Sequence, residues 1–101
     1  MNNIQKHLSV MAEKWGLSKD IMIRYADLVS ELGELGKELV VGTNYGEKPL
    51  EASENLAEEI GDVFFTLLLL ANALDLDIEE CFAKTMEKCE KRMADKGHIG
   101  S

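Results

Sequence analysis

The segment Ala57–Ala71, AEEIGDVFFTLLLLA, constrains the fold most, because its character changes halfway along. Its first half carries acidic residues and its second half is almost purely apolar. On a helix, where each residue turns by about 100°, Glu59 and Asp62 lie on one side with an apolar stripe beside them. The stripe consists of Leu56, Ile60, Val63, Leu67, Leu70 and Leu74. The segment therefore predicts one helix that presents carboxylates next to a hydrophobic core.

The second half of this helix has more apolar surface than one core can cover. Phe65, Leu68 and Leu69 lie outside the stripe, which predicts burial on a second side. We expect a partner subunit to provide that cover. The apolar run is roughly ten residues, well short of the roughly 20 that span a bilayer, so it predicts a buried helix and not a membrane anchor.

Length and charge restrict the domain count and the partners. A chain of 101 residues predicts a single domain over residues 1–101, which is small enough that oligomerisation helps it to bury apolar surface. The formal net charge of −8 argues against nucleic acid and anionic membranes, because both favour a basic surface. We therefore expect neither as a main partner.

The two cysteines and the N-terminus predict a cytoplasmic protein. Cys81 and Cys89 lie in one predicted helix, about 12 Å apart along its axis, which is too far for a disulfide. The N-terminal segment MNNIQKHLSV has no apolar signal region and no transit-peptide pattern. Reduced thiols and the lack of an export signal both fit the cytoplasm.

The pattern of apolar residues and helix-ending residues predicts four helices, at about residues 3–15, 19–41, 51–74 and 78–95. Gly16 and Gly42 end the first two, Ser18 or Asp20 caps the second, and Asp77 caps the fourth. The segment GTNYGEKPLEAS before the third helix is rich in turn-forming residues and predicts a surface loop. No alternation typical of strands occurs, so we predict an all-α, four-helix bundle-like domain.

Acidic residues cluster on the second predicted helix as well. Asp27, Glu31, Glu34 and Glu38 project to one side, beside a leucine stripe. Two helices thus each offer carboxylates at i, i+3, where like charges cost about 0.2–0.5 kcal/mol per pair unless a cation compensates. Carboxylate oxygens favour Mg²⁺, with Mn²⁺ or Ca²⁺ as alternatives. A simple solvated acidic surface is the competing interpretation.

A di-iron carboxylate bundle would also gather glutamates between helices, but it requires Glu-x-x-His pairs. The two histidines, His7 and His98, lie near the ends of the chain, and neither follows an acidic residue by three positions. The sequence therefore disfavours a di-iron site.

The last predicted helix carries a basic stripe opposite its apolar side. The stripe consists of Lys84, Lys88, Lys91 and Arg92. Next to carboxylate pairs, such a stripe favours a polyphosphate site, with a metal on one side and Lys84, Lys88 and Arg92 on the other. A solvated helix face with surface ion pairs is the alternative. No GxxxxGK[ST] motif is present, which excludes a P-loop enzyme.

The ordered pattern Glu31-Leu-Gly-Glu34 followed by Glu59-Ile-Gly-Asp62 resembles the ExxE…ExxD signature of MazG-like nucleotide pyrophosphohydrolases, in the all-α NTP pyrophosphatase superfamily. The resemblance extends over about residues 15–92. It implies that these four acidic residues bind Mg²⁺ and that the basic residues at 88 and 92 contact phosphate. It also implies a dimer or tetramer that hydrolyses a nucleoside triphosphate between the α and β phosphates, giving a monophosphate and pyrophosphate.

Three positions depart from that family pattern. Many members have a second glutamate where this chain has Ser30, so we expect Glu38 to take over any role in activating water. Some members have lysine where this chain has Asn55, and many have asparagine at Cys89. The contacts to substrate are therefore expected to differ from those of other members.

The resemblance leaves the nucleotide base without a predicted contact. Trp15 is a candidate surface for stacking on the base, with a place in the core as the alternative. Asn55 and Asn44 are candidates for contacts with the base or sugar, with ordinary surface positions as the alternative. A second class of function also fits the sequence, namely a non-enzymatic module that dimerises through its apolar helix and binds a basic partner through its acidic faces.

Overall fold

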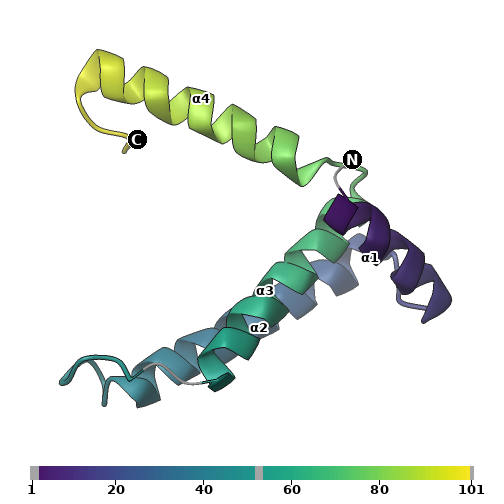
Figure 1. Ribbon diagram of the computed structural model, residues 1–101, viewed down its shortest axis with the longest axis horizontal. Coiled ribbons are helices and arrows are strands. Elements are labelled where there is room, and N and C mark those ends of the chain that lie inside the picture. Colours follow the sequence, from purple (N-terminus) through teal and green to yellow (C-terminus); the bar gives the residue numbers. More distant parts are fainter. Residues whose placement is uncertain (1–2, 52–53, 101) are drawn as a thin grey trace.

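The computed structural model in Figure 1 describes residues 3–51 and 54–100, and within these ranges it contains four α-helices and no strand. They are α1 (Asn3–Lys14), α2 (Ile21–Gly42), α3 (Glu54–Ala73) and α4 (Ile78–Lys96). The all-α prediction is confirmed, and the predicted helix bounds agree to within a few residues. The third helix was expected to begin near 51, but residue 51 is not helical and residues 52–53 lie outside the described part.

The predicted capping residues account for where α2 and α4 begin. The Asp20 carboxylate accepts hydrogen bonds from the backbone amides of Met22 and Ile23, at 2.9 and 3.1 Å. Asp77 accepts bonds from the amides of the second and third residues of α4 in the same way. Of the two candidates at the start of α2, Asp20 is thus the cap, while the Ser18 hydroxyl accepts a bond from the Asp20 amide.

Helices α2 and α3 lie side by side and antiparallel, and α1 packs across the end of α3 (Figure 1). Helix α4 leaves from the same corner and projects away from the α2–α3 pair, so the chain has the shape of a V in Figure 1. One chain alone therefore does not close its four helices into a bundle. No helix within residues 3–51 and 54–100 is long and apolar enough to cross a membrane.

The core lies where α1 meets α3, and it corrects one expectation. Leu68 and Leu69 are 3% and 5% exposed, and they pack with Leu8 of α1 in the same chain. The prediction that these two leucines face a partner subunit is wrong. Conversely, Ile60 and Leu74, which were assigned to the core stripe, are 54% and 43% exposed. A helix that is apolar nearly all round does not show by its pattern which side its neighbours will cover.

A buried polar side chain fixes the corner from which α4 leaves. Gln5 of α1 is fully buried, and its Nε2 donates hydrogen bonds to Asn72 Oδ1 at 3.0 Å and to the Leu76 carbonyl at 2.8 Å. Asn72 Nδ2 in turn donates to the Gln5 carbonyl at 3.2 Å. These bonds tie α1 to the segment between α3 and α4, so the direction of α4 is set by specific contacts.

Candidate functional site

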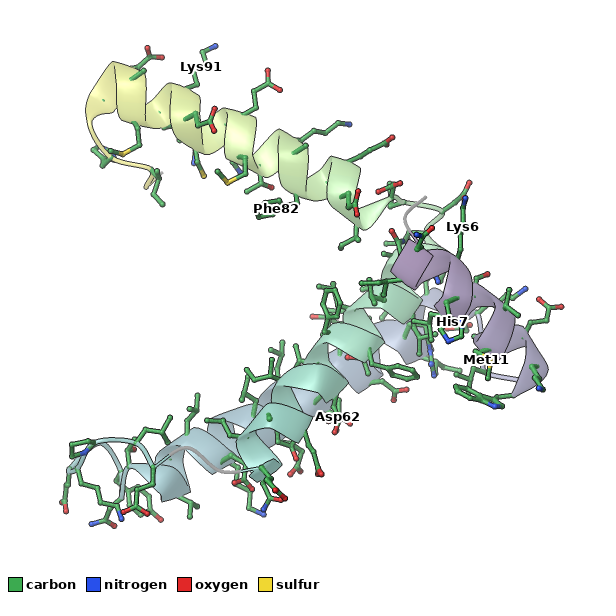
Figure 2. All side chains as sticks on the ribbon, in the orientation of Figure 1. Lys6, His7, Met11, Asp62, Phe82 and Lys91 are labelled. Carbon is green, nitrogen blue, oxygen red and sulfur yellow. The ribbon has the colours of Figure 1, made fainter. Side chains whose placement is uncertain are left out.

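Three carboxylates from two helices meet midway along the α2–α3 pair. Glu31 of α2 and Glu59 and Asp62 of α3 each offer one oxygen, and these oxygens all lie within 4.8 Å of one another. Glu59 and Asp62 are one helical turn apart, and the antiparallel packing of α2 and α3 brings Glu31 opposite them. Figure 2 labels Asp62 in the middle of α3. We call these three residues the carboxylate triad.

Glu59 is the member of the triad for which a cation matters most. Its Oε2 is buried and has no hydrogen-bond partner. Burial raises the pKa of Glu59 above its ordinary value of 4.5, and the charges of Asp62, Glu31, Glu34 and Glu38 raise it further. A buried acceptor oxygen among like charges is costly unless a cation compensates it. The triad therefore fits a hard divalent cation, and the donor set is purely oxygen, as Mg²⁺ and Mn²⁺ prefer.

The other two acidic residues predicted from the sequence lie beside the triad. Glu34 is exposed and is not part of the triad, although its charge acts on Glu59. Glu38 is half-buried and lines a cavity of about 350 Å³ between the end of α2, the following loop and the start of α3. Asn55, one turn before Glu59, lines the same cavity.

The loop after α2 adds a residue that sequence reasoning missed. Lys48 also lines the cavity that contains Glu38 and Asn55, and its backbone amide is held by the Thr43 carbonyl at 3.0 Å. It is the single basic residue of the predicted loop, which was the available signal. Asn44, by contrast, uses its side-chain amide within the loop, where it donates to Glu47 Oε2 at 3.0 Å.

An apolar pocket of about 460 Å³ lies between α1 and α3. Trp15, which directly follows α1, lines it and is 56% exposed, so it is not a core residue. Phe65 and Gly61 of α3 also line the pocket, and Gly61 directly precedes Asp62. Trp15 thus offers a flat aromatic surface in this pocket, of the kind on which a base can stack.

The structure does not bring the basic residues of α4 to the triad of the same chain. Lys84, Lys88 and Arg92 all lie on α4, which projects away from α2 and α3 (Figure 1). The Arg92 guanidinium instead donates to the Ile99 carbonyl at 3.3 Å. Between described residues, no ion pair joins a basic residue of α4 to another helix. The predicted phosphate site therefore is not assembled within one chain.

The sequence profile of the MazG nucleotide pyrophosphohydrolase domain matches residues 21–96. The chain belongs to the MazG family. The matched range contains the triad, Glu34, Glu38 and the basic residues of α4, whereas Trp15 lies outside it.

One relative supports this assignment, both by its sequence and by its crystal structure. A protein of uncharacterised function from Bacillus subtilis, YpjD, is 47% identical over 74 residues, which are 70% of this chain and 65% of that protein. The chain thus matches somewhat less than two-thirds of the length of this curated relative. The crystal structure of YpjD, described there as a candidate pyrophosphatase, has a TM-score of 0.71 at 38% identity and covers 87% of this chain and 90% of that one.

One buried charge of this MazG domain was not anticipated. Arg24 of α2 is 8% exposed, and its Nη2 lies 2.9 Å from Asp27 Oδ2, while its Nε has no partner. Arg24 precedes the half-buried Leu28 by one helical turn and so lies on the predicted leucine stripe of α2. That position within an apolar stripe was the signal for its burial.

Proposed function

We propose that this MazG domain is a Mg²⁺-dependent nucleoside triphosphate pyrophosphohydrolase. In this proposal it cleaves between the α and β phosphates, releases a nucleoside monophosphate and pyrophosphate, accepts Mn²⁺ in place of Mg²⁺, and works as a homodimer or homotetramer. The observation that carries the proposal is the carboxylate triad, in which Glu59 Oε2 is buried without a hydrogen-bond partner.

The residues that would hold the cation are Glu31, Glu59 and Asp62, with Glu34 at the exposed edge. When bound, the cation supplies Lewis-acid polarisation of the phosphoryl oxygens and lowers the pKa of the attacking water. Because α2 and α3 are long, packed helices, they hold the triad in place before substrate arrives, which reduces the cost of ordering it.

Glu38 is our candidate for the proton acceptor. It stands outside the triad but close enough for its charge to raise the pKa of Glu59, and it lines the cavity that opens beside α3. A carboxylate at that place can take a proton from water without giving up a place among the cation ligands.

The two cavities would receive different parts of the substrate. Lys48 and Asn55 provide a cation and an amide on the Glu38 side, which suits phosphate or sugar oxygens. The pocket with Trp15 and Phe65 is almost wholly apolar and suits the base. Its polar edges are few, so we expect stacking to contribute more than hydrogen bonding to the affinity for the base.

The experiment is an incubation of the purified protein with each common ribo- and deoxyribonucleoside triphosphate and Mg²⁺, with products separated by ion-exchange chromatography. We expect monophosphate and pyrophosphate in equal amounts, with no activity in EDTA and recovery on adding Mn²⁺. Release of diphosphate and inorganic phosphate would contradict the assigned bond. No hydrolysis of any of them with either metal would favour the non-enzymatic binding module.

A further inference from the structure

The pair formed by Arg24 and Asp27 has no role in the function proposed above. The Arg24 side chain is 9% exposed, and its Nη2 donates to Asp27 Oδ2 at 2.9 Å. Arg24 Nε is buried without a hydrogen-bond partner. Burying a guanidinium costs free energy that a paired carboxylate offsets, and the resulting charged hydrogen bond holds the Asp27 carboxylate in a fixed position.

Asp27 itself is only half covered, and one of its oxygens is available to a ligand. Its side chain is 52% exposed. Among the residues that the structure describes, the Asp27 carboxylate accepts one side-chain hydrogen bond, from Arg24 to Oδ2. Oδ1 is therefore an oriented acceptor at the surface of α2. An acceptor that is already oriented loses little conformational entropy when a ligand binds to it.

The charge of Asp27 differs from that of the triad, although both belong to the acidic side of the α2–α3 pair. Glu59 lies among like charges that raise its pKa, whereas Asp27 is already paired with the Arg24 guanidinium. A divalent cation therefore gains less at Asp27 than at the triad, and a phosphate is repelled by the carboxylate. A neutral donor such as a hydroxyl group is the ligand that suits Oδ1 best.

Asp27 lies where the proposed substrate has its hydroxyl groups. It precedes Glu31 by about 6 Å along the axis of α2, toward the end of the helix that adjoins α1 (Figure 1). The apolar pocket lies in the same direction from the triad, because Phe65 and Leu68 follow Asp62 on the antiparallel α3 and α1 forms the other wall. With phosphates at the triad and the base in this pocket, the sugar that joins them lies level with Asp27.

We propose that Asp27 binds the sugar of the substrate: its Oδ1 accepts a hydrogen bond from a sugar hydroxyl, and Arg24 positions the carboxylate for that contact. This inference rests on the proposed function for the nature of the substrate. Asp27 then determines sugar specificity, because a substrate without the hydroxyl leaves a charged acceptor unpaired. The monophosphate product retains the sugar, so the contact can be measured by binding alone, without turnover.

The test measures the binding of nucleoside monophosphates with Mg²⁺ by isothermal titration calorimetry. The ligands are adenosine and uridine 5′-monophosphates with their 2′-deoxy and 3′-deoxy forms, which identify the hydroxyl that is bound. We expect wild type to bind one of the deoxy forms about tenfold or more weakly than the ribose form. Asp27→Ala should bind all three forms alike, whereas Asp27→Asn retains a neutral acceptor and should keep a smaller preference.

A second variant guards against loss of folding. Asp27→Ala leaves the buried guanidinium without its carboxylate, which destabilises the protein. Arg24→Met combined with Asp27→Ala removes both charges, so it should keep the helix content of wild type and also bind the three forms alike. Arg24→Met alone should reduce the sugar preference, because Asp27 is no longer oriented. It should add nothing to the effect of Asp27→Ala, since Arg24 acts through Asp27.

Glu13→Gln is the matched control, because Glu13 forms an exposed ion pair with Lys19 at 3.2 Å and the substitution removes the same charge. It should keep the wild-type preference. The inference is overturned if wild type binds the three forms alike, if it binds none of them at millimolar concentration, or if Asp27→Ala retains the preference. A preference that Asp27→Ala abolishes, in a protein that hydrolyses no triphosphate, would refute the proposed function only.

Discussion

The carboxamide of Gln5 connects the first helix to the last, because its Oε1 accepts a hydrogen bond from the backbone amide of Ile78 at 2.8 Å. The same side chain donates to Leu76 and Asn72, so one fully buried residue satisfies several polar groups at the corner. Its position fixes where α4 begins relative to the α2–α3 pair. The corner therefore links a buried hydrogen-bond network to the direction of the helix that carries the basic residues.

The first prediction concerns this corner. Gln5→Leu should lower the free energy of unfolding by about 2–4 kcal/mol, because the Ile78 amide, the Leu76 carbonyl and Asn72 Oδ1 each lose the hydrogen bond to the Gln5 side chain. Urea unfolding at one fixed protein concentration measures this loss. The neighbouring Lys6 is exposed, so Lys6→Leu is the control and should change stability by less than about 0.5 kcal/mol. A Gln5→Leu protein as stable as that control would contradict the role of the corner.

The second prediction concerns the cost of the triad without a cation. Glu59→Gln removes one charge from a group of like charges, so in EDTA its melting temperature should be a few degrees higher than that of wild type. Hydrolysis should fall by at least about a hundredfold, because a cation ligand is lost. Added Mg²⁺ should raise the melting temperature of wild type more than that of the variant.

Glu58 provides the control for this comparison, since it is the preceding residue and is exposed outside the triad. Glu58→Gln should respond to Mg²⁺ as wild type does and should keep its activity. If Glu59→Gln retained wild-type turnover and the same shift with Mg²⁺, the triad would have no part in binding metal.

The third prediction follows from the raised pKa of Glu59 in the metal-free protein. A raised pKa means that the folded state binds a proton more tightly than the unfolded state. Below about pH 4.5, the ordinary pKa of this carboxyl, the group is protonated in both states and does not lower the free energy of unfolding. As the pH rises from about 4.5 through the folded-state pKa, stability should fall, and above it the loss should stay constant. Unfolding in EDTA at a series of pH values should show this fall in wild type and a smaller one in Glu59→Gln. If the free energies of unfolding of wild type and Glu59→Gln changed in parallel with pH, Glu59 would not be the group whose pKa is raised.

Local features of the sequence predicted much of this structure. Asp20 and Asp77 act through hydrogen bonds to amides two and three residues away, so their roles as helix caps could be inferred directly. The meeting of Glu31 with Glu59 and Asp62 followed from helical spacing and from the resemblance to a known family. The caps depend on near neighbours in sequence, whereas the meeting of acidic residues from α2 and α3 was expected because of the family resemblance.

Features that depend on packing between distant segments could not be predicted in this way. Leu68 and Leu69 are covered by α1, but an all-round apolar helix gives no sign of which neighbour takes which side. We predicted that the basic residues of α4 lie next to the carboxylates, because both groups suit one polyphosphate site. Periodicity cannot show that the corner at Gln5 and Ile78 turns α4 away within the chain.

The last prediction concerns the apolar pocket between α1 and α3. Trp15 is 56% exposed and lines a cavity of about 460 Å³ whose wall includes Gly61, the residue before Asp62. If the base stacks there, Trp15→Ala removes a contact worth about 1–3 kcal/mol, which raises KM by about 5- to 150-fold. Because stacking stabilises the bound substrate and the transition state equally, kcat should change little. Trp15→Phe keeps an aromatic face and should lose less, and Tyr45→Ala, an 81% exposed aromatic in the loop, should change neither constant. Steady-state kinetics with the preferred triphosphate measure both constants, and a Trp15→Ala enzyme with wild-type KM would assign the base to a different surface.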